Sequence, residues 1–231
     1  MYGPPGTGKT STVLALAKDL FGADFYRQRV LELNASDERG IQVVREKVKK
    51  FAQRKIARHP DGRNVPQLQF VILDEADSMT HDAQAALRRI IEAYSETTRF
   101  CIICNYISKI IDPLASRCVK FRFAPIAKDA QKERLLSICT AEKVNLQSES
   151  VIDKLIDLTE GDLRRSINTL QTCASYTKET GLGVAELNAV SGIVPNKAIL
   201  MISTVVGTRG ATYADIQRVA EDVIFEGYDC Q

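Results

Sequence analysis

Over roughly the first 125 residues, short apolar runs alternate with stretches in which apolar positions recur every three or four residues. Helical spacing of this kind places apolar side chains on one face, whereas a short apolar run bounded by polar residues is typical of a buried strand. The helical spacing occurs at 11–21, 41–51 and 83–94, and the apolar runs lie at 30–34, 70–73, 99–104 and 118–123. The alternation predicts an α/β fold with a parallel sheet flanked by helices.

The pattern changes near Pro125, after which the strand-like runs stop. Helical stretches are expected instead at 131–143, 151–158, 163–176 and 184–190, with two more after Pro195. We therefore expect three parts: an α/β domain over 1–126, a small helical domain over 127–193, and a helical piece over 194–231 that is too short for a core of its own.

Composition narrows the class of protein. The chain is 45% hydrophobic and 26% charged, as globular proteins are, and its formal net charge is only +2. A nucleic-acid partner would therefore need a local basic surface. No apolar run is long enough for a bilayer, so we expect no membrane association. Cys101-x-x-Cys104 lies in an apolar run without a second ligand pair, which favours buried thiols over a zinc site.

The first ten residues carry the clearest chemical motif, Gly3-x-x-x-x-Gly8-Lys9-Thr10. Glycines let the backbone curl so that its N–H groups converge, and the helix that follows adds its positive end, so the loop attracts polyphosphate. Lys9 is suited to bridge the outer phosphates and Thr10 to place a hydroxyl on Mg²⁺. The alternative is a glycine-rich surface turn. The predicted nucleotide-binding residues are Gly3, Pro4, Pro5, Gly6, Thr7, Gly8, Lys9, Thr10 and Ser11.

Two carboxylates, Asp74 and Glu75, follow the apolar run at 70–73. Ligands of open α/β sheets gather at the carboxyl ends of strands. Asp74 is suited to hold Mg²⁺, and Glu75 to polarise a water for attack on a γ-phosphate. The alternative is that these acids cap the next helix, which is the role we expect for Asp77.

Three other polar residues fit the same chemistry less specifically. Asn105 follows the run at 99–104 and could orient the attacking water. Arg117 could serve as an arginine finger, and Arg164, at the start of a helix in the second part, could reach the γ-phosphate. From spacing alone, the more common interpretation is that each arginine has a solvated or salt-bridged side chain.

Seven blocks in order resemble one family, the small subunits of replication factor C, which are AAA+ ATPases of the clamp loader in DNA replication. The blocks are LELNASDERGI at 31–41, VILDEADSM at 71–79, AQAALRR at 83–89, RFCIICNY at 99–106, PLASRC at 113–118, KFRF at 120–123 and EGDLRR at 160–165. The resemblance extends from Tyr2 to about Val194 and then fades into the beginning of a helical collar.

The resemblance implies a P-loop AAA+ domain, a helical lid and a partial collar in the three expected parts. It implies ATP and Mg²⁺ as ligands, with Lys9 and Thr10 in Walker A, Asp74 and Glu75 in Walker B, and Asn105 as sensor 1. Arg164 would be sensor 2 and would contact the nucleotide, and Arg117 would act in trans on a neighbour's nucleotide.

In that family, five subunits form a hetero-pentamer in the nucleus that opens a sliding clamp and loads it on primer–template DNA during replication and repair. Contacts with DNA phosphates would come from Arg39, Arg45 and Lys49, although a solvated basic helix face explains the same pattern. The compartment rests on the resemblance alone.

The sequence departs from the family at both ends. Only two residues precede the P-loop, where relatives have a central strand, and the collar is short, so we expect a piece of a longer subunit. We expect the missing strand to leave an apolar slot with unpaired backbone groups, no rise in melting temperature with ATP–Mg²⁺, and poor assembly into the ring.

Two alternatives remain open at this point. One is a different AAA+ motor, such as a branch-migration helicase, which the SRC and LNASDERG motifs disfavour. The other is a structural subunit or shortened isoform that does not hydrolyse ATP, although Lys9, Asp74 and Glu75 are all present.

Overall fold

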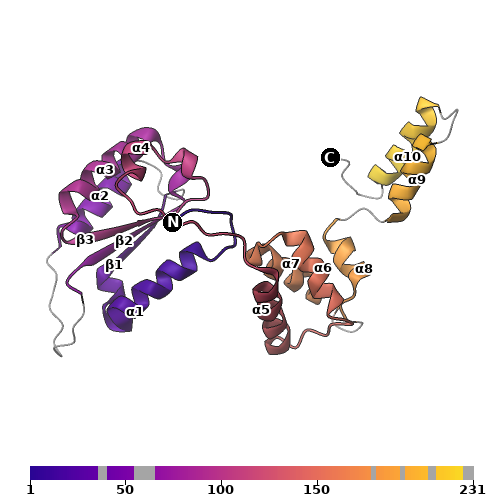
Figure 1. The fold of residues 1–231 in the computed structure, drawn as a ribbon, viewed down its shortest axis with the longest axis horizontal. Coiled ribbons are helices and arrows are strands. Elements are labelled where there is room, and N and C mark those ends of the chain that lie inside the picture. The colour runs from indigo at the N-terminus through magenta and orange to yellow at the C-terminus, as the bar shows by residue number, and fades with distance from the viewer. Residues whose placement is uncertain (36–40, 55–65, 178–180, 193–195, 208–211, 226–231) are drawn as a thin grey trace. The chain divides into compact units, whose positions relative to one another are not determined.

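The computed structural model describes residues 1–35, 41–54, 66–177, 181–192, 196–207 and 212–225. The chain divides into two compact units, Met1–Pro125 and Ile126–Gln231 (Figure 1), and each is described by itself.

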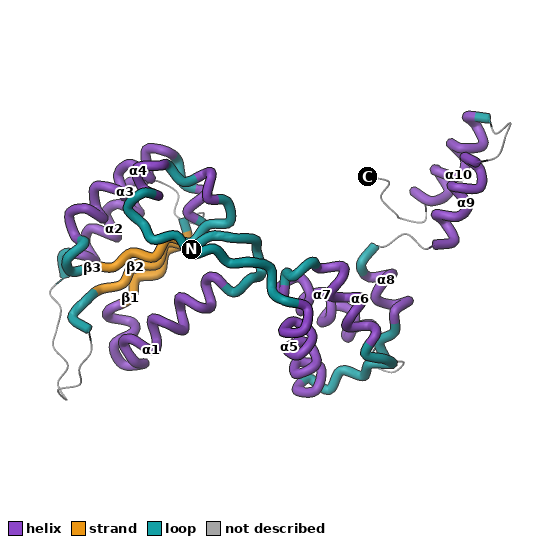
Figure 2. The backbone as a smooth tube through the Cα atoms, in the orientation of Figure 1, coloured by secondary structure: helices purple, strands orange, loops and turns teal. Residues whose placement is uncertain are grey.

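The first unit is built on three parallel strands, β1 (Val30–Asn34), β2 (Gln69–Asp74) and β3 (Thr98–Ile102), in the order β1-β2-β3. Leu33 of β1 pairs with Leu73 of β2, which pairs with Ile102 of β3, so the three carboxyl ends lie at one edge. The predicted α/β class with a parallel, helix-flanked sheet is confirmed (Figure 2).

Helices cover both faces of this sheet. Helix α1 (Lys9–Arg29) lies on one side, while α2 (Ile41–Ala52) and α3 (His81–Tyr94) lie on the other (Figure 1). Successive side chains of a strand point to opposite faces. Ile72 therefore packs with the α1 residues Val13 and Ala17, whereas Val71 and Leu73 pack toward α2 and α3. All five are fully buried.

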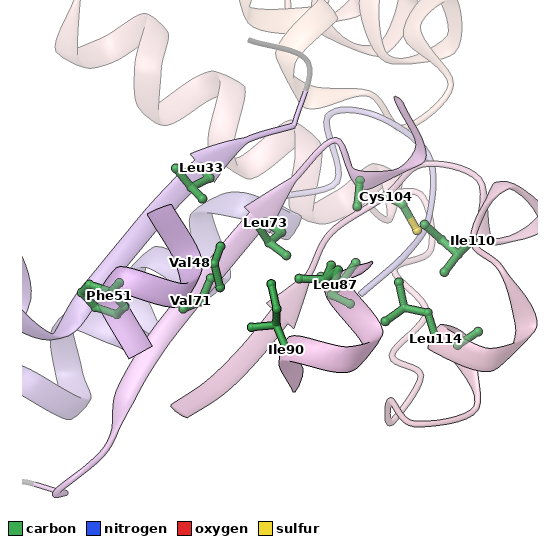
Figure 3. Packing of buried hydrophobic residues seen from close by; sticks show 13 residues of the cluster. Leu33, Val48, Phe51, Val71, Leu73, Leu87, Ile90, Cys104, Ile110 and Leu114 are labelled. Atoms are coloured by element: carbon green, nitrogen blue, oxygen red, sulfur yellow. The ribbon is translucent and has the colours of Figure 1, made fainter. Parts of the chain in front are cut away.

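The core under α2 and α3 is the larger of the two clusters that flank the sheet. Figure 3 shows it from close by: side chains from the strands meet those of the two helices, and Cys104, Ile110 and Leu114 extend it beyond β3. Its labelled members are Leu33, Val48, Phe51, Val71, Leu73, Leu87, Ile90, Cys104, Ile110 and Leu114. This packing fixes the strand ends from which the polar side chains project.

The strand expected at 118–123 is wrong as a regular element. Only Arg122 forms a bridge there, with Tyr2, which also bridges Cys104. Tyr2 N donates to Phe121 O at 2.9 Å, and Phe123 N donates to Tyr2 O at 2.8 Å. One residue cannot sustain a ladder, so the 118–123 segment stays extended without strand pairing along its length.

The apolar slot expected beside the P-loop is partly filled by the first residues. The Met1 ammonium donates to Ile102 O at 2.7 Å, and Cys104 N donates to Met1 O at 3.1 Å. A cavity of about 30 Å³ remains next to Met1 and Tyr2. Backbone groups at this end of β3 therefore have partners, contrary to the expectation that they would be unpaired.

Three short helical turns complete the first unit: η1 (Ala76–Ser78), η2 (Ile107–Lys109) and α4 (Asp112–Ala115). The second unit begins with α5 (Lys128–Ala141), α6 (Ser150–Thr159), α7 (Leu163–Tyr176) and α8 (Val184–Val190). Their core is apolar, and its fully buried members include Leu135, Ile152, Leu155, Leu182 and Leu187.

Two further helices, α9 (Asn196–Gly207) and α10 (Tyr213–Phe225), pack against each other. They carry several exposed apolar side chains, among them Leu200, Tyr213 and Phe225. None of the helices in the described ranges combines the length and the apolar character that a bilayer span requires.

Candidate functional site

The glycines of the P-loop have backbone conformations that other residues rarely adopt. Gly3 has φ 148° and Gly8 has φ 85°. A Cβ atom on Gly3 would lie 2.1 Å from the carbonyl oxygen of Phe123, so the close approach of the Phe123 backbone excludes a side chain there. Gly8 precedes α1 directly, and its left-handed conformation turns the chain into the helix.

Lys9, at the start of α1, points back into the loop. Its Nζ donates to Gly3 O and Pro4 O, both at 2.8 Å, and to the Asn105 side-chain oxygen at 2.9 Å. The Lys9 side chain is 7% exposed. The buried ammonium thus lies between the P-loop and the residue that follows β3.

The next residue links the P-loop to the acid at the end of β2. The Thr10 hydroxyl donates to Asp74 Oδ2 at 2.7 Å. Asp74 is half-buried, and its other oxygen, Oδ1, accepts from the Glu75 N–H at 2.9 Å. A hydroxyl and a carboxylate at hydrogen-bond distance offer two oxygen ligands of the kind that Mg²⁺ prefers.

Glu75 has an exposed side chain on a strained backbone. Its φ of 53° and ψ of 37° are left-handed, which is uncommon for a residue with a side chain, and such strain clusters at functional sites. The Glu75 side chain is exposed, whereas Asp74 accepts the hydrogen bond from Thr10. The two neighbouring acids are therefore placed in different environments, in keeping with the different roles predicted for them.

Asp77 is the residue whose role the sequence interpretation got wrong. Thr80, not Asp77, caps α3: its hydroxyl accepts from Ala83 N. Asp77 Oδ2 instead accepts from the N–H groups of Asn105 and Tyr106, each at 3.3 Å. Asp77 thereby ties the turn after β2 to the turn after β3 and holds Asn105 near Lys9. In the sequence, only the position of Asp77 two residues after Glu75 pointed to this residue.

The two arginines predicted for the γ-phosphate lie in different units. Arg117 follows α4 in the first unit and is exposed, and it forms an ion pair with Glu92 of α3. Arg164 is an exposed residue in the first turn of α7, whose N-cap is Asp162. The structure brings Lys9, Thr10, Asp74 and Asn105 together, and Glu75 follows Asp74 directly, while the roles of the two arginines stay predictions.

The residues predicted to contact DNA are only partly covered by the structure. Arg39 lies outside the described residues. Arg45 belongs to α2, but its side chain is also outside what is described, and Lys49 is exposed near the end of that helix. Their contact with DNA stays a prediction.

Cysteine thiols line the neighbouring strand end. Cys101 lies in β3 and is half-buried, and Cys104 is buried just beyond it. Burial, as the largest cause, raises the pKa of both thiols, so both favour the neutral form. Among the two histidines, His81 is exposed, and His59 falls outside the described ranges.

The site fits a nucleoside triphosphate and a divalent cation. Helix α1 begins without a side-chain cap, and its first turn contains no acidic residue, so its positive end suits an anion. Lys9 would supply a charge for the phosphates, and Thr10 and Asp74 would supply oxygen ligands for Mg²⁺. These are the groups by which residues 3–11 would hold the nucleotide.

Two family models match the chain. The ATPase family associated with various cellular activities (AAA) matches residues 1–126, more than half of the chain. The lid domain of RCF1/5-like AAA+ ATPases matches residues 133–175, which include α6 and most of α5 and α7.

Curated relatives match almost the whole chain. It is 49% identical to replication factor C subunit 4 of Homo sapiens over 98% of this chain and 62% of the relative. It is 45% identical to replication factor C subunit 2 of Schizosaccharomyces pombe, again over 98% of this chain and 66% of the relative. With subunit 2 of Phaeosphaeria nodorum, the identity is 39% over 68% of that protein. The chain thus spans 62–68% of the length of these three relatives.

Solved structures share the fold at low identity. The ORC1 protein of Aeropyrum pernix, solved in complex with DNA, matches with a TM-score of 0.63 at 17% identity, over 100% of this chain and 72% of that one. The RuvB protein of Thermotoga maritima matches with a TM-score of 0.58 at 13% identity, over 89% of this chain and 67% of that one. Taken with the family models and the curated relatives, the P-loop, the acids after β2 and the lid helices show that the chain belongs to the replication factor C subunits of the AAA ATPase family.

Proposed function

We propose that the chain is an ATPase subunit of a replication factor C clamp loader. The observation that carries the proposal is the convergence of Lys9, Thr10, Asp74 and Asn105, which three separate segments bring to the carboxyl edge of the sheet. Buried polar groups of this kind are stable only when paired, and the present partners are ones that a phosphate and a cation could replace.

Lys9 carries the first step, which is binding. Its ammonium exchanges the Gly3 and Pro4 carbonyls and the Asn105 amide oxygen for phosphate oxygens. Once Lys9 turns to the phosphates, the Asn105 oxygen loses that donor and becomes able to accept from a water. Asp77 keeps Asn105 in place during the exchange because it accepts a hydrogen bond from the Asn105 backbone N–H.

Asp74 and Glu75 divide the work of hydrolysis. Asp74 and the Thr10 hydroxyl would hold Mg²⁺, which would supply positive charge to the phosphates of the nucleotide. Glu75, exposed next to Asp74, accepts a hydrogen bond from the attacking water and aligns it. Asp74 is unsuited to this task because its carboxylate accepts the hydrogen bond from Thr10. We therefore assign the attacking water to Glu75.

The remaining roles follow from membership in a ring. Arg117 would act as a finger on the nucleotide of a neighbouring subunit, and Arg164 would contact the γ-phosphate from the lid. The hydrolysis cycle would open a sliding clamp and place it on primer–template DNA in the nucleus, as part of a hetero-pentamer. Arg39, Arg45 and Lys49 would contact phosphates of the duplex without reading its sequence.

The test is ATP turnover by the chain assembled with its companion subunits, with and without clamp and primed DNA. A clamp loader gives turnover that rises when both are present and falls in the Lys9→Ala variant. Full activity with DNA alone, accompanied by strand separation, would assign the chain to a helicase. ATP binding without any turnover in this subunit would assign it to a structural position.

A further inference from the structure

The ion pair between Arg117 and Glu92 orients the guanidinium group as well as neutralising its charge. Arg117 Nε donates to Glu92 Oε1 at 2.5 Å, and Nη1 donates to Pro113 O at 2.6 Å. The Nε–H and one N–H of Nη1 are thereby occupied. No described residue accepts from Nη2, so Nη2 and the second N–H of Nη1 form an outward edge with two parallel donors.

Such an edge matches two oxygens of one phosphate. Arginine binds phosphate in a bidentate manner because its planar fork fits the spacing of the oxygens. Arg117 and Glu92 side chains are 40% and 41% exposed, so the edge is accessible at the surface of the first unit.

Glu92 is itself held on a rigid element. It lies near the end of α3, where Arg88 Nε approaches the same Oε1 at 3.6 Å. Helix α3 follows directly after the turn that carries Asp74 and Glu75, and α4, which precedes Arg117, packs on α3. One helix therefore connects the acids of this subunit's own site to the carboxylate that holds its finger.

We propose that Glu92 is a positioning residue for Arg117, which it holds with its outer N–H pair ready for the terminal phosphate of a nucleoside triphosphate bound by a neighbouring subunit. This inference rests on the proposed function, since it assigns the orientation of a finger whose partner is in trans. A pair that only stabilised the α4 turn would use the same contacts but would leave turnover unchanged.

The experiment compares Glu92→Ala and Glu92→Gln in the chain assembled with its companion subunits. An exposed ion pair is worth at most ~1 kcal/mol, so Glu92→Ala should lower kcat by about fivefold. KM for ATP should stay unchanged, because the finger acts on the transition state. Glu92→Gln keeps an acceptor for Nε and should recover part of the loss. Glu96→Ala, a change at an exposed acid just beyond α3, is the matched control and should leave kcat unchanged.

A double variant separates failure of the inference from failure of the proposed function. Glu92→Ala should add nothing in an Arg117→Ala background, because it acts only through Arg117. If Arg117→Ala lowers kcat and Glu92→Ala does not, or if the two losses multiply, the inference is wrong. If Arg117→Ala itself has no effect, the proposed finger is wrong.

A spectroscopic measurement tests the geometry without assembly. In the chain labelled with ¹⁵Nε-arginine, the Arg117 Nε–H should exchange slowly with water in the parent and rapidly in Glu92→Ala, with Arg88→Ala having the smaller effect. Equal exchange in the parent and Glu92→Ala would show that the carboxylate does not hold the guanidinium.

Discussion

Two polar clusters, one in each unit, are built alike but differ in what they can do. The first joins Lys9, Thr10, Asp74 and Asn105 at the sheet edge. In the second, Gln131 Nε2 donates to Ser166 Oγ at 2.7 Å, and the Ser166 hydroxyl lies 2.7 Å from that of Thr159. Both connect elements that are far apart in the sequence through short hydrogen bonds.

The clusters differ in charge and in exposure. The first contains an ammonium and a carboxylate, and its Thr10, Asp74 and Asn105 are only half-buried, so a ligand can reach and replace the contacts. In the second, Gln131 and Ser166 are 0% exposed and neutral. Burial of a neutral network fixes packing, whereas a half-open charged network can exchange partners. The comparison is consistent with the first cluster being the proposed site and the second being part of the core.

The largest effect is expected from removing the charge of the first cluster. Lys9→Ala should lower ATP turnover of the assembled complex at this subunit's site by about 10²–10³-fold, the range seen when one preorganised transition-state donor is lost. The matched control is Lys18→Ala at an exposed position of the same helix, which should leave turnover unchanged. Equal turnover in both variants would remove Lys9 from the mechanism.

The next effect separates chemistry from binding within the same cluster. Glu75→Gln should lower turnover by about 10²-fold, because the amide is a poor base. Binding of ATP–Mg²⁺ should persist, since Thr10 and Asp74 are unchanged. Single-turnover kinetics and equilibrium titration measure the two quantities. A loss of binding equal to the loss of turnover would show that Glu75 holds the cation instead.

A substitution in the second cluster should change the free energy of unfolding rather than ATP turnover. Ser166→Ala removes the hydroxyl that accepts from Gln131 and donates to Asp162 O. A buried amide without its acceptor costs about 1–3 kcal/mol in free energy of unfolding. Ser175→Ala, on the exposed face of α7, is the control and should change little. Hydrogen exchange of α7 amides measures both, and equal protection would contradict the structural role.

The smallest effect is expected for a surface pair, Lys128–Asp157, whose atoms lie 2.6 Å apart. The hydrogen bond from Lys128 lowers the pKa of Asp157 below 3.8, and the hydrogen bond to Asp157 raises the pKa of Lys128 above 10.5. The pair therefore stabilises the fold between these values. Its contribution is lost as pH falls through the lowered pKa or rises through the raised one.

Asp157→Asn should therefore shift the urea midpoint slightly at neutral pH. The difference from the parent should vanish in high salt because exposed pairs are screened. A shift that persisted in high salt would show that Asp157 acts through packing instead.

The sheet and most helices could be predicted because the apolar residues within each element recur with a single spacing. The apolar run at 70–73 and the helical spacing at 83–94 are unambiguous, and the structure extends each by only one or two residues at its ends. Parallel strands bring their carboxyl ends to one edge of the sheet. The sequence therefore predicts that Lys9, Asp74 and Asn105 lie close together at this edge.

Other features depend on tertiary contacts that no local pattern contains. Met1 and Tyr2 join β3 to the 121–123 segment through backbone groups, which carry no side-chain signal. Asp77 could equally cap a helix or hold a loop, and only the position of Asn105 decides between them. The Glu92–Arg117 pair joins positions 25 residues apart, a spacing without periodic meaning.

The central claim is that the Lys9 cluster binds a triphosphate, and nucleotide stoichiometry tests it most directly. Titration of the assembled complex with ATP–Mg²⁺ should show one nucleotide fewer per copy of this chain when Lys9 is replaced by alanine. Ser166→Ala should retain the full number. If the Lys9→Ala complex bound as many nucleotides as the parent, with the same affinity at every site, the cluster would not be the nucleotide site.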